Sequence, residues 1–286
     1  LASGIVAVGD ICNTAATTEQ KSMGRMTYHN FIEVSGFAGA AADTRFRNAI
    51  ELQKQLAATG PSTIVPHAPY SVSPELFKLI NDHAQGQILS MHNQESAEEN
   101  DFFLTGRSDF RTLYKAIGLE LDFFTPPHLT SLQYVASFLQ KPQQLLLVHN
   151  VVTSQADLDM LGQPSATGSF PATYFCLCPN ANQYISNSLP PVDLFLKNNC
   201  PIVLGTDSLA SNYQLSITEE MKTLQLAFPA LTPGQLLAWA TVNGAEALGL
   251  SEKFGSFEKG KTPGIVCMGT MNKNGRTIFT NSTRLL

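Results

Sequence analysis

A histidine and a glutamate stand close together at the end of an apolar stretch, in the sequence Leu-Ser-Met-His-Asn-Gln-Glu over positions 89–95. The apolar residues predict a buried strand, so His92 and Glu95 are expected where that strand ends. At such a place an imidazole can bind a metal ion and a carboxylate can move a proton. A His-x-x-Glu pair arises easily by chance, so its meaning depends on the other strand ends.

Three other predicted strands also end in potential metal ligands, namely His67, His149 and Asp207. In a closed barrel of parallel strands, the carboxyl ends of all strands meet at one mouth, so these residues would converge with His92. Three imidazoles and a carboxylate suit Zn²⁺ or Fe²⁺, and such an ion lowers the pKa of a bound water toward about 7. The alternative is that each histidine only bonds a loop carbonyl and Asp207 only caps a turn. That alternative needs a separate coincidence at every strand end, so we favour the metal site.

Strands and helices alternate along the chain in a way that would position these residues. The strands are short and apolar without alternation, which is typical of parallel strands covered on both faces. Repeated strand–helix units build either a (β/α)8 TIM-type barrel or a doubly wound sheet. No Gly-x-Gly-x-x-Gly follows the first strand, and polar residues at the strand ends favour the barrel. We expect strands over 4–8, 31–34, 62–66, 88–91, 145–148, 174–178 and 201–205. Helices are expected over 43–58, 108–117, 129–139, 154–161, 192–198, 216–227 and 233–248. A further helix is expected to begin at Pro74, with Ser73 as its N-cap.

The two ends of the chain differ from its middle. Leu1 is not a methionine, and the strand expected over 4–8 has no cap or leader before it, so we expect further sequence upstream. From Phe254 onward the chain is rich in glycine and β-like, with its clearest strand over 264–268.

The composition is that of a soluble globular protein with a sizeable core, since 43% of the 286 residues are hydrophobic and 14% are charged. The net charge is −5 and the basic residues form no stripe, so nucleic acid is not expected as a partner. No apolar run is long enough to cross a bilayer and no signal-peptide pattern opens the chain. The five cysteines form no zinc-ribbon or disulfide framework, which favours a cytoplasmic protein with reduced thiols.

Short motifs at the strand ends and near the C-terminus form an ordered set. They are His67-Ala-Pro-Tyr70, His92-x-x-Glu95, Val148-His149-Asn150, Cys178-Pro-x-x-Asn182, Leu204-Gly-Thr-Asp-Ser208, Thr241-Val-Asn-Gly-Ala245 and Gly255-Ser-Phe-Glu-Lys-Gly-Lys261. In this order they resemble the amidohydrolase superfamily, most closely its branch of cytosine-, guanine- and adenosine-type deaminases and chlorohydrolases. The resemblance covers nearly the whole chain, and the ordered set is far more specific than any one motif.

The resemblance implies a role for each residue at the strand ends. His92, from the fifth barrel strand, would bind one divalent metal ion, zinc or iron. Asp207, from the eighth strand, would also bind the metal and pass on a proton. Glu95 would carry protons between the water and a ring nitrogen of the substrate, and His149 would orient or deprotonate the attacking water.

The resemblance also implies where the substrate lies and how the chain divides. His67 would lie beside the substrate rather than on the metal, and Asn182 would lie near the mouth after the seventh strand. Residues 1–253 would form the barrel from its second strand onward. Residues 254–286 would be the C-terminal part of a small β-sandwich domain.

The sequence departs from the family pattern at three places. No His-x-His is present, although the family's first strand ends in one and takes two metal ligands from it. The barrel is therefore expected to lack its first strand in this chain. Ala181 replaces the serine common before Asn182, and Gln94 is an unusual neighbour of Glu95 that would bear on substrate recognition.

The function implied is that of a metal-dependent hydrolase that deaminates an amino-substituted nitrogen heterocycle, such as a purine, pyrimidine or nucleoside derivative. The partner would be a small-molecule substrate, with no nucleic acid or membrane, and a homodimer is the default assembly. The same site would also serve to displace chloride from a ring or to open a cyclic amide. A catalytically inactive, ligand-binding homologue is the alternative outside the enzymes, and the missing His-x-His favours it if the chain is whole.

Overall fold

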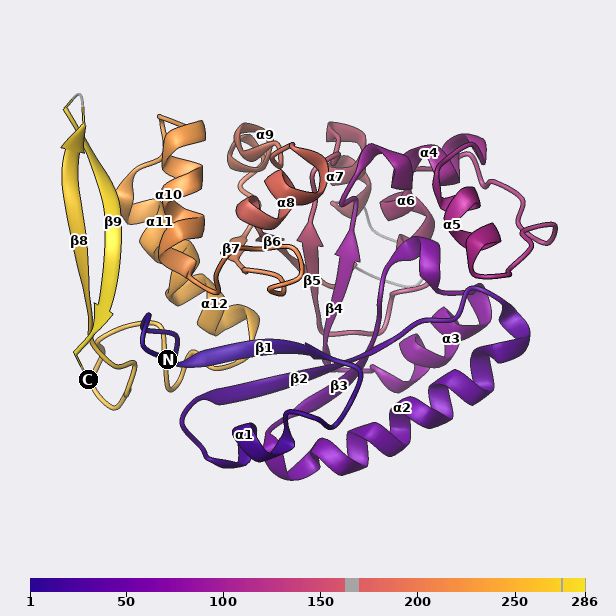
Figure 1. Cartoon of the computed structure of the whole chain (residues 1–286), viewed down its shortest axis with the longest axis horizontal. Coiled ribbons are helices and arrows are strands. Elements are labelled where there is room, and N and C mark those ends of the chain that lie inside the picture. The colour runs from indigo at the N-terminus through magenta and orange to yellow at the C-terminus, as the bar shows by residue number, and fades with distance from the viewer. Residues whose placement is uncertain (163–169, 274, 286) are drawn as a thin grey trace.

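Parallel strands form the centre of the fold (Figure 1). The computed structural model describes residues 1–162, 170–273 and 275–285. The first parallel sheet contains β1 (Ala7–Cys12), β2 (Thr27–Val34) and β3 (Ser62–Pro66), and the second contains β4 (Ile88–Asn93), β5 (Gln144–His149), β6 (Ala172–Leu177) and β7 (Ile202–Leu204). The sheets meet where the amide of His92 donates to the carbonyl of His67 at 2.9 Å. The strands thus follow one another in chain order, and the predicted TIM-type α/β fold is confirmed.

The strands are covered on both faces, which explains why their sequences do not alternate. In β5, Leu145 and Leu147 are fully buried, and Leu146 on the opposite face is only 6% exposed. Within the described residues, β1 and β7 at the two ends of the series each pair on one side only.

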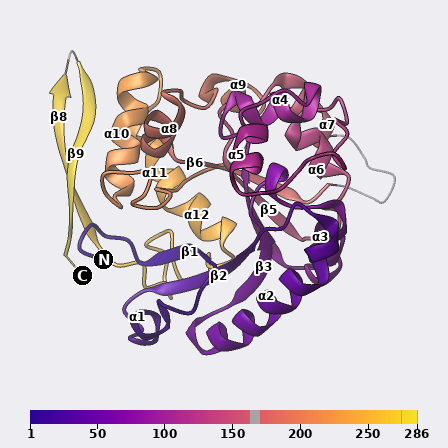
Figure 2. The same cartoon turned by 45° about the vertical axis from the view of Figure 1, so that its right-hand side comes forward.

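Helices lie along the outside of the strands and over their carboxyl ends. They are α1 (Thr18–Ser22), α2 (Ala42–Leu56), α3 (Pro74–His83), α4 (Ala97–Thr105), α5 (Phe110–Ala116), α6 (Ser131–Ala136), α7 (Gln155–Leu161), α8 (Pro179–Ser186), α9 (Val192–Lys197), α10 (Ile217–Ala227), α11 (Pro233–Ala240) and α12 (Val242–Ala247), with short 3-10 turns at Gly39–Ala41, Ala57–Thr59 and Pro69–Ser71. Figures 1 and 2 show α2 and α3 beside the first sheet and α4, α5 and α6 grouped away from the C-terminal hairpin. None of the helices in the described ranges is long and apolar enough to span a membrane.

Helix α3 shows how local sequence builds these elements. The hydroxyl of Ser73 accepts a hydrogen bond from the amide of Leu76 at 3.2 Å, and Pro74 occupies the first turn, as predicted. Leu76, Phe77 and Ile80 share the face that packs on the strands, and all three are fully buried.

Some predicted elements differ from the observed ones. The first strand begins at Ala7 instead of residue 4, and His29, expected before a strand, lies inside β2. The helix predicted over 233–248 breaks at Thr241, whose backbone leaves the helical region with φ −128° and ψ −83°, so that α11 and α12 are separate. Helices α1, α4 and α8 were not predicted, because all three are short and α4 carries little apolar periodicity.

The phenylalanine-rich segment between β4 and β5 packs mainly upon itself. Phe102 and Phe103 are fully buried in a cluster with Phe37 and Tyr114, separate from the main core. Phe123 lies at its edge and is 54% exposed. The buried aromatic residues of this segment therefore serve packing.

The C-terminal hairpin consists of β8 (Val266–Lys273) and β9 (Arg276–Arg284), which pair antiparallel at one side of the molecule (Figure 1). Gln225 of α10 anchors it, since its side chain donates to the carbonyl of Thr277 at 3.0 Å and accepts from the amide of Phe279 at 2.9 Å. The division of the chain at residue 254 into a barrel and part of a small β-sandwich domain stays a prediction. Two positions of the C-terminal part, 274 and 286, lie outside the described residues.

Residues 255–262, between α12 and β8, match the spacing of a nucleotide-binding phosphate loop, Gly-x-x-x-x-Gly-Lys-Thr. Such a loop runs from a strand directly into a helix. Here the segment leads from α12 toward β8, and Phe257 within it is 80% exposed. The match in spacing therefore does not indicate a nucleotide-binding site.

Candidate active site

The side chains at the carboxyl ends of β3, β4 and β5 gather at one place. The ring centroids of His67 and His92 lie 5.2 Å apart, and those of His92 and His149 lie 5.5 Å apart. The parallel register of β4 and β5 pairs His92 with Val148, so His149 follows one residue beyond the level of His92 at the same end of the sheet. The predicted convergence of these three imidazoles is thus present.

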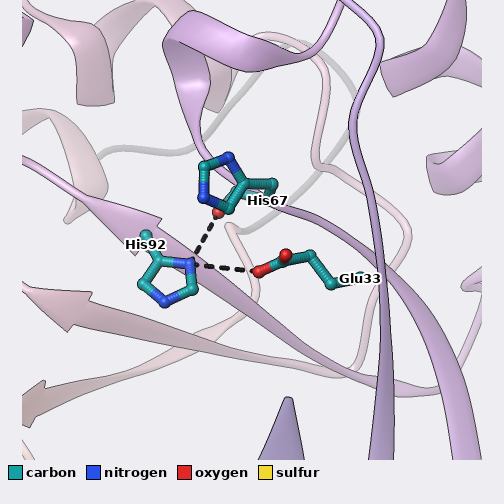
Figure 3. A group of neighbouring side chains, drawn as sticks. All are labelled: Glu33, His67 and His92. Atoms are coloured by element: carbon teal, nitrogen blue, oxygen red, sulfur yellow. Dashed lines mark hydrogen bonds and ion pairs between the residues drawn. The ribbon is translucent and has the colours of Figure 1, made fainter. Parts of the chain in front are cut away.

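Potential ligand atoms at this mouth fall into two groups, in each of which the atoms lie within 4.8 Å of one another. One group joins Glu95, His149 and Asp207, all of which were predicted. The other joins Glu33, His67 and His92 (Figure 3), and Glu33 was not predicted. A single acidic residue inside the apolar stretch Phe-Ile-Glu-Val of β2 was the available signal, because a buried charge needs a partner.

The hydrogen bonds of His92 determine which of its ring nitrogens is free. Its Nδ1 lies 3.0 Å from the carbonyl of His67 and 3.5 Å from Oε2 of Glu33 (Figure 3). A carbonyl oxygen only accepts, so Nδ1 carries the hydrogen and Nε2 has its lone pair available. Metal-binding histidines commonly donate their second N–H to a carbonyl or carboxylate in this way. His92 therefore fits a metal ligand.

His67 is held as a neutral imidazole. Its Nδ1 lies 2.6 Å from the Ser71 hydroxyl, which itself donates to the carbonyl of Ala68 at 3.1 Å. Burial lowers the pKa of His67 to about 4, and the neighbouring His92 adds to this effect. The Nε2 of this neutral ring is left to contact a ligand.

His149 contacts both Asn182 and Glu95 and is fully buried. Its Nδ1 lies 2.9 Å from Nδ2 of Asn182, and its Nε2 lies 3.3 Å from Oε1 of Glu95. Because the amide Nδ2 donates, Nδ1 accepts and the ring hydrogen is on Nε2, the nitrogen on the side of Glu95. Burial lowers the pKa of His149 to about 3, so the ring is neutral. Asn182, expected near the substrate, is buried against His149.

Two polar atoms of this pair lack a hydrogen-bond partner within the described part of the chain. They are Nε2 of His149 and Oδ1 of Asn182, both buried. Buried polar atoms are nearly always satisfied in folded proteins, so unsatisfied ones at a mouth indicate a position for a bound group. This observation and the free Nε2 of His92 fit a divalent cation with its water or substrate.

Glu95 is poised to hold a proton. Burial raises its pKa by more than the nearby His92 lowers it, and the negative charge of Asp207 adds to the rise. A carboxyl group with a raised pKa holds its proton to higher pH, which suits a general acid.

The loops that carry the site residues are strained. Gln94, His149, Asn150 and Asp207 are not glycine, yet their φ angles are 49°, 80°, 60° and 55°. Left-handed backbone of this kind costs free energy and is concentrated at functional sites.

The loop of Asp207 is anchored to α10. The hydroxyl of Ser211 donates to Oδ2 of Asp207. The side-chain amide of Asn212 donates to the carbonyl of Thr206 and to Oε1 of the buried Glu220, at 2.7 Å in both cases. Glu220 also accepts from the backbone amide of Asn180 at 2.9 Å, so it links the loops after β6 and β7.

Comparisons with known proteins agree with this arrangement. A model of the amidohydrolase family matches residues 2–284. The chain is 25% identical over 213 residues to the 5-methylthioadenosine/S-adenosylhomocysteine deaminase of Halothermothrix orenii, an alignment that spans 72% of this chain and 43% of that protein. Its fold is similar to that of Helicobacter pylori aminofutalosine deaminase in complex with methylthio-coformycin, with a TM-score of 0.79 and 20% identity over 100% of this chain and 73% of that one. An adenosine deaminase from Xanthomonas campestris with bound zinc is also similar, with a TM-score of 0.67 and 22% identity over 93% and 58%.

Proposed function

The chain belongs to the amidohydrolase family, and on that premise we propose that it hydrolytically deaminates an amino-substituted nitrogen heterocycle, most specifically a nucleoside derivative of the adenosine type. The contact between Glu95 and the neutral His149 carries the proposal, because it places a carboxyl group with a raised pKa and an N–H group side by side next to His92. The deaminase names of the similar proteins support the same reaction.

We propose that His92 and Asp207, whose ligand atoms belong to the two different groups at this mouth, together hold one divalent metal ion. Zinc is favoured over iron because a structurally similar deaminase contains it, although imidazole and carboxylate donors suit both. A bound ion of this kind lowers the pKa of its water toward about 7.

Glu95 gives its proton to the ring nitrogen next to the carbon that bears the amino group. This neutralises the charge that develops on the ring as water adds to that carbon. His149, neutral and held by Asn182, uses its Nε2 hydrogen to orient the water or the new oxygen. Asp207 accepts a proton from the water and passes it to the departing amine. As the amine departs as ammonia, the hydroxyl group left on that carbon returns its proton to Glu95 and becomes the carbonyl. One water is consumed, and the products are the ring carbonyl compound and ammonia.

We propose that His67 contacts the substrate and does not bind the metal. Its Nδ1 is engaged by Ser71, and its ring lies across that of Tyr70 with centroids 5.8 Å apart. Asn182 acts on the substrate through His149, because its side chain is buried.

Product analysis tests the proposal. The natural full-length protein is loaded with zinc and incubated with adenosine derivatives, amino- and chloro-substituted pyrimidines and triazines, and cyclic amides. We expect ammonia from the amino-substituted compounds. Chloride or a new carboxylate as the main product would replace deamination by dechlorination or by cyclic amide hydrolysis. Tight binding with no product would favour an inactive ligand-binding protein.

A further inference from the structure

The turn between β4 and α4 carries Glu95 and is strained. Gln94, the residue before it, has a φ angle of 49°. Such a conformation persists only where surrounding groups hold it. The position of the Glu95 carboxyl group therefore depends on whatever fixes the backbone of residues 94 and 95.

Glu99 reaches back from α4 to this turn. It is the third residue of the helix after the N-cap Ser96, and it is 1% exposed. Its Oε1 accepts from the amide of Gln94 at 2.8 Å, and its Oε2 accepts from the amide of Glu95 at 3.4 Å. In an ordinary capping box, a glutamate at this helix position bonds the amide of the N-cap residue. Here the same geometry is directed further back, onto the strained residue and the proposed proton carrier.

The side chain of Gln94 fixes the other side of the turn. It is fully buried, accepts from the Thr153 hydroxyl at 2.6 Å and donates to Oδ2 of Asp157 at 3.3 Å. Asp157 is also fully buried, and it caps α7 through the amide of Ser154 at 2.9 Å. Gln94 thus points into the protein instead of toward a substrate, and the turn is tied to the start of α7 as well as to α4.

We propose that Glu99 is a positioning residue for Glu95, and that it acts with Gln94 and Thr153 to hold the carboxyl group where it exchanges its proton with the substrate. Glu99 touches no reacting atom and acts through the backbone amide of Glu95. The assignment rests on the proposed role of Glu95 in deamination.

The test compares Glu99→Gln with Glu98→Gln in the natural full-length, zinc-loaded protein. Glutamine has one acceptor oxygen, so it does not accept from both amides. Glu98 is the matched control, because its carboxylate contacts the start of α5 instead of the turn: it accepts from the amide of Asp109 at 2.9 Å and interacts with the side chain of Ser108. We expect Glu99→Gln to lower kcat by about 10- to 100-fold, as a displacement of about 1 Å does, with KM and zinc content little changed. We expect Glu98→Gln to leave all three unchanged.

Amide hydrogen exchange of the segment over 91–96 is the second readout. We expect exchange at Gln94 and Glu95 to become about tenfold faster or more in Glu99→Gln, since both amides lose or weaken their bond to the Glu99 carboxyl group. Unchanged exchange, together with a kcat per zinc-loaded molecule equal to that of Glu98→Gln, would reduce Glu99 to a stabilising residue and overturn the proposal.

Thr153→Val keeps the proposal testable if Glu99→Gln does not fold. This variant removes only the hydroxyl that donates to Gln94, and we expect smaller changes in the same directions. Wild-type kcat and exchange in Thr153→Val would then contradict the proposal. A wild-type protein that releases no ammonia would refute the deaminase function itself, whereas amide exchange would still decide whether Glu99 holds the turn.

Discussion

Nε2 of His149 lies 3.3 Å from Oε1 of Glu95, although the two residues come from different strand ends. Burial keeps the imidazole neutral and raises the pKa of the carboxyl group. The contact therefore joins a group that donates an N–H with one that holds a transferable proton.

The first prediction concerns the tautomer of His149. Asn182→Asp replaces the amide that donates to Nδ1 with a carboxylate that accepts, so the ring hydrogen should move to Nδ1 and no longer face Glu95. We expect kcat to fall by at least about 100-fold and up to about 10⁴-fold, the cost of a wrong tautomer in the Ser-His-Asp triad, with zinc content retained.

Gln183→Glu is the control for that variant, because it adds a carboxylate to the same helix at an exposed position. Steady-state kinetics and zinc analysis of both variants check the prediction. Equal kcat values for Asn182→Asp and the wild type would show that the Asn182 contact does not set the tautomer.

Zinc binding is expected to depend on His92 and Asp207. His92→Ala and Asp207→Asn should each lower the zinc content from about one ion per chain to a small fraction and remove the rise in Tm that added zinc produces. His83→Ala is the control, because His83 lies at the end of α3 and contacts Gln53. Full zinc occupancy in His92→Ala would rule out His92 as a ligand.

Acid sensitivity should arise partly from His29. It is buried in β2, where its Nε2 lies 3.1 Å from the Thr63 hydroxyl, and burial lowers its pKa to about 4 from 6.5. A lowered histidine pKa means that the stability it contributes is complete above pH 6.5 and is lost as the pH falls toward 4. The loss amounts to about 3 kcal/mol.

His29→Gln removes this loss, so the unfolding free energy of the variant should fall less steeply than that of the wild type between pH 6.5 and 4. The difference between the two proteins is the proper readout, because Glu99 and Glu220, whose pKa values burial raises to about 7, contribute with the opposite sign. Denaturant unfolding at several pH values checks it, and parallel pH dependences would contradict it.

Most of the site was predictable because it depends on strand ends. An apolar run that stops at a histidine or an aspartate locates His92, His149 and Asp207 without knowledge of the fold, and a parallel barrel then requires that they converge. The bounds of β3 and the Ser73 cap were also predicted, since both follow from local residue chemistry.

The residues that were missed depend on contacts between distant segments. Glu33 belongs to the site only because β2 and β3 pair, and β3 meets β4, so that its carboxylate reaches Nδ1 of His92. From the sequence, Gln94 was expected to bear on substrate recognition as an unusual neighbour of Glu95. Only the fold shows that its buried side chain is hydrogen-bonded to Thr153 and Asp157. The sequence pattern alone contains neither relationship.

The most direct measurement is ammonia release by the zinc-loaded wild type and by Glu95→Gln, with the zinc content of each determined in parallel. We expect the two proteins to hold equal zinc, and the variant to release ammonia about 1,000-fold more slowly, because glutamine keeps the shape of the side chain but carries no acidic proton. Glu95→Gln that turns over at more than about a tenth of the wild-type rate would contradict the proposed role of Glu95.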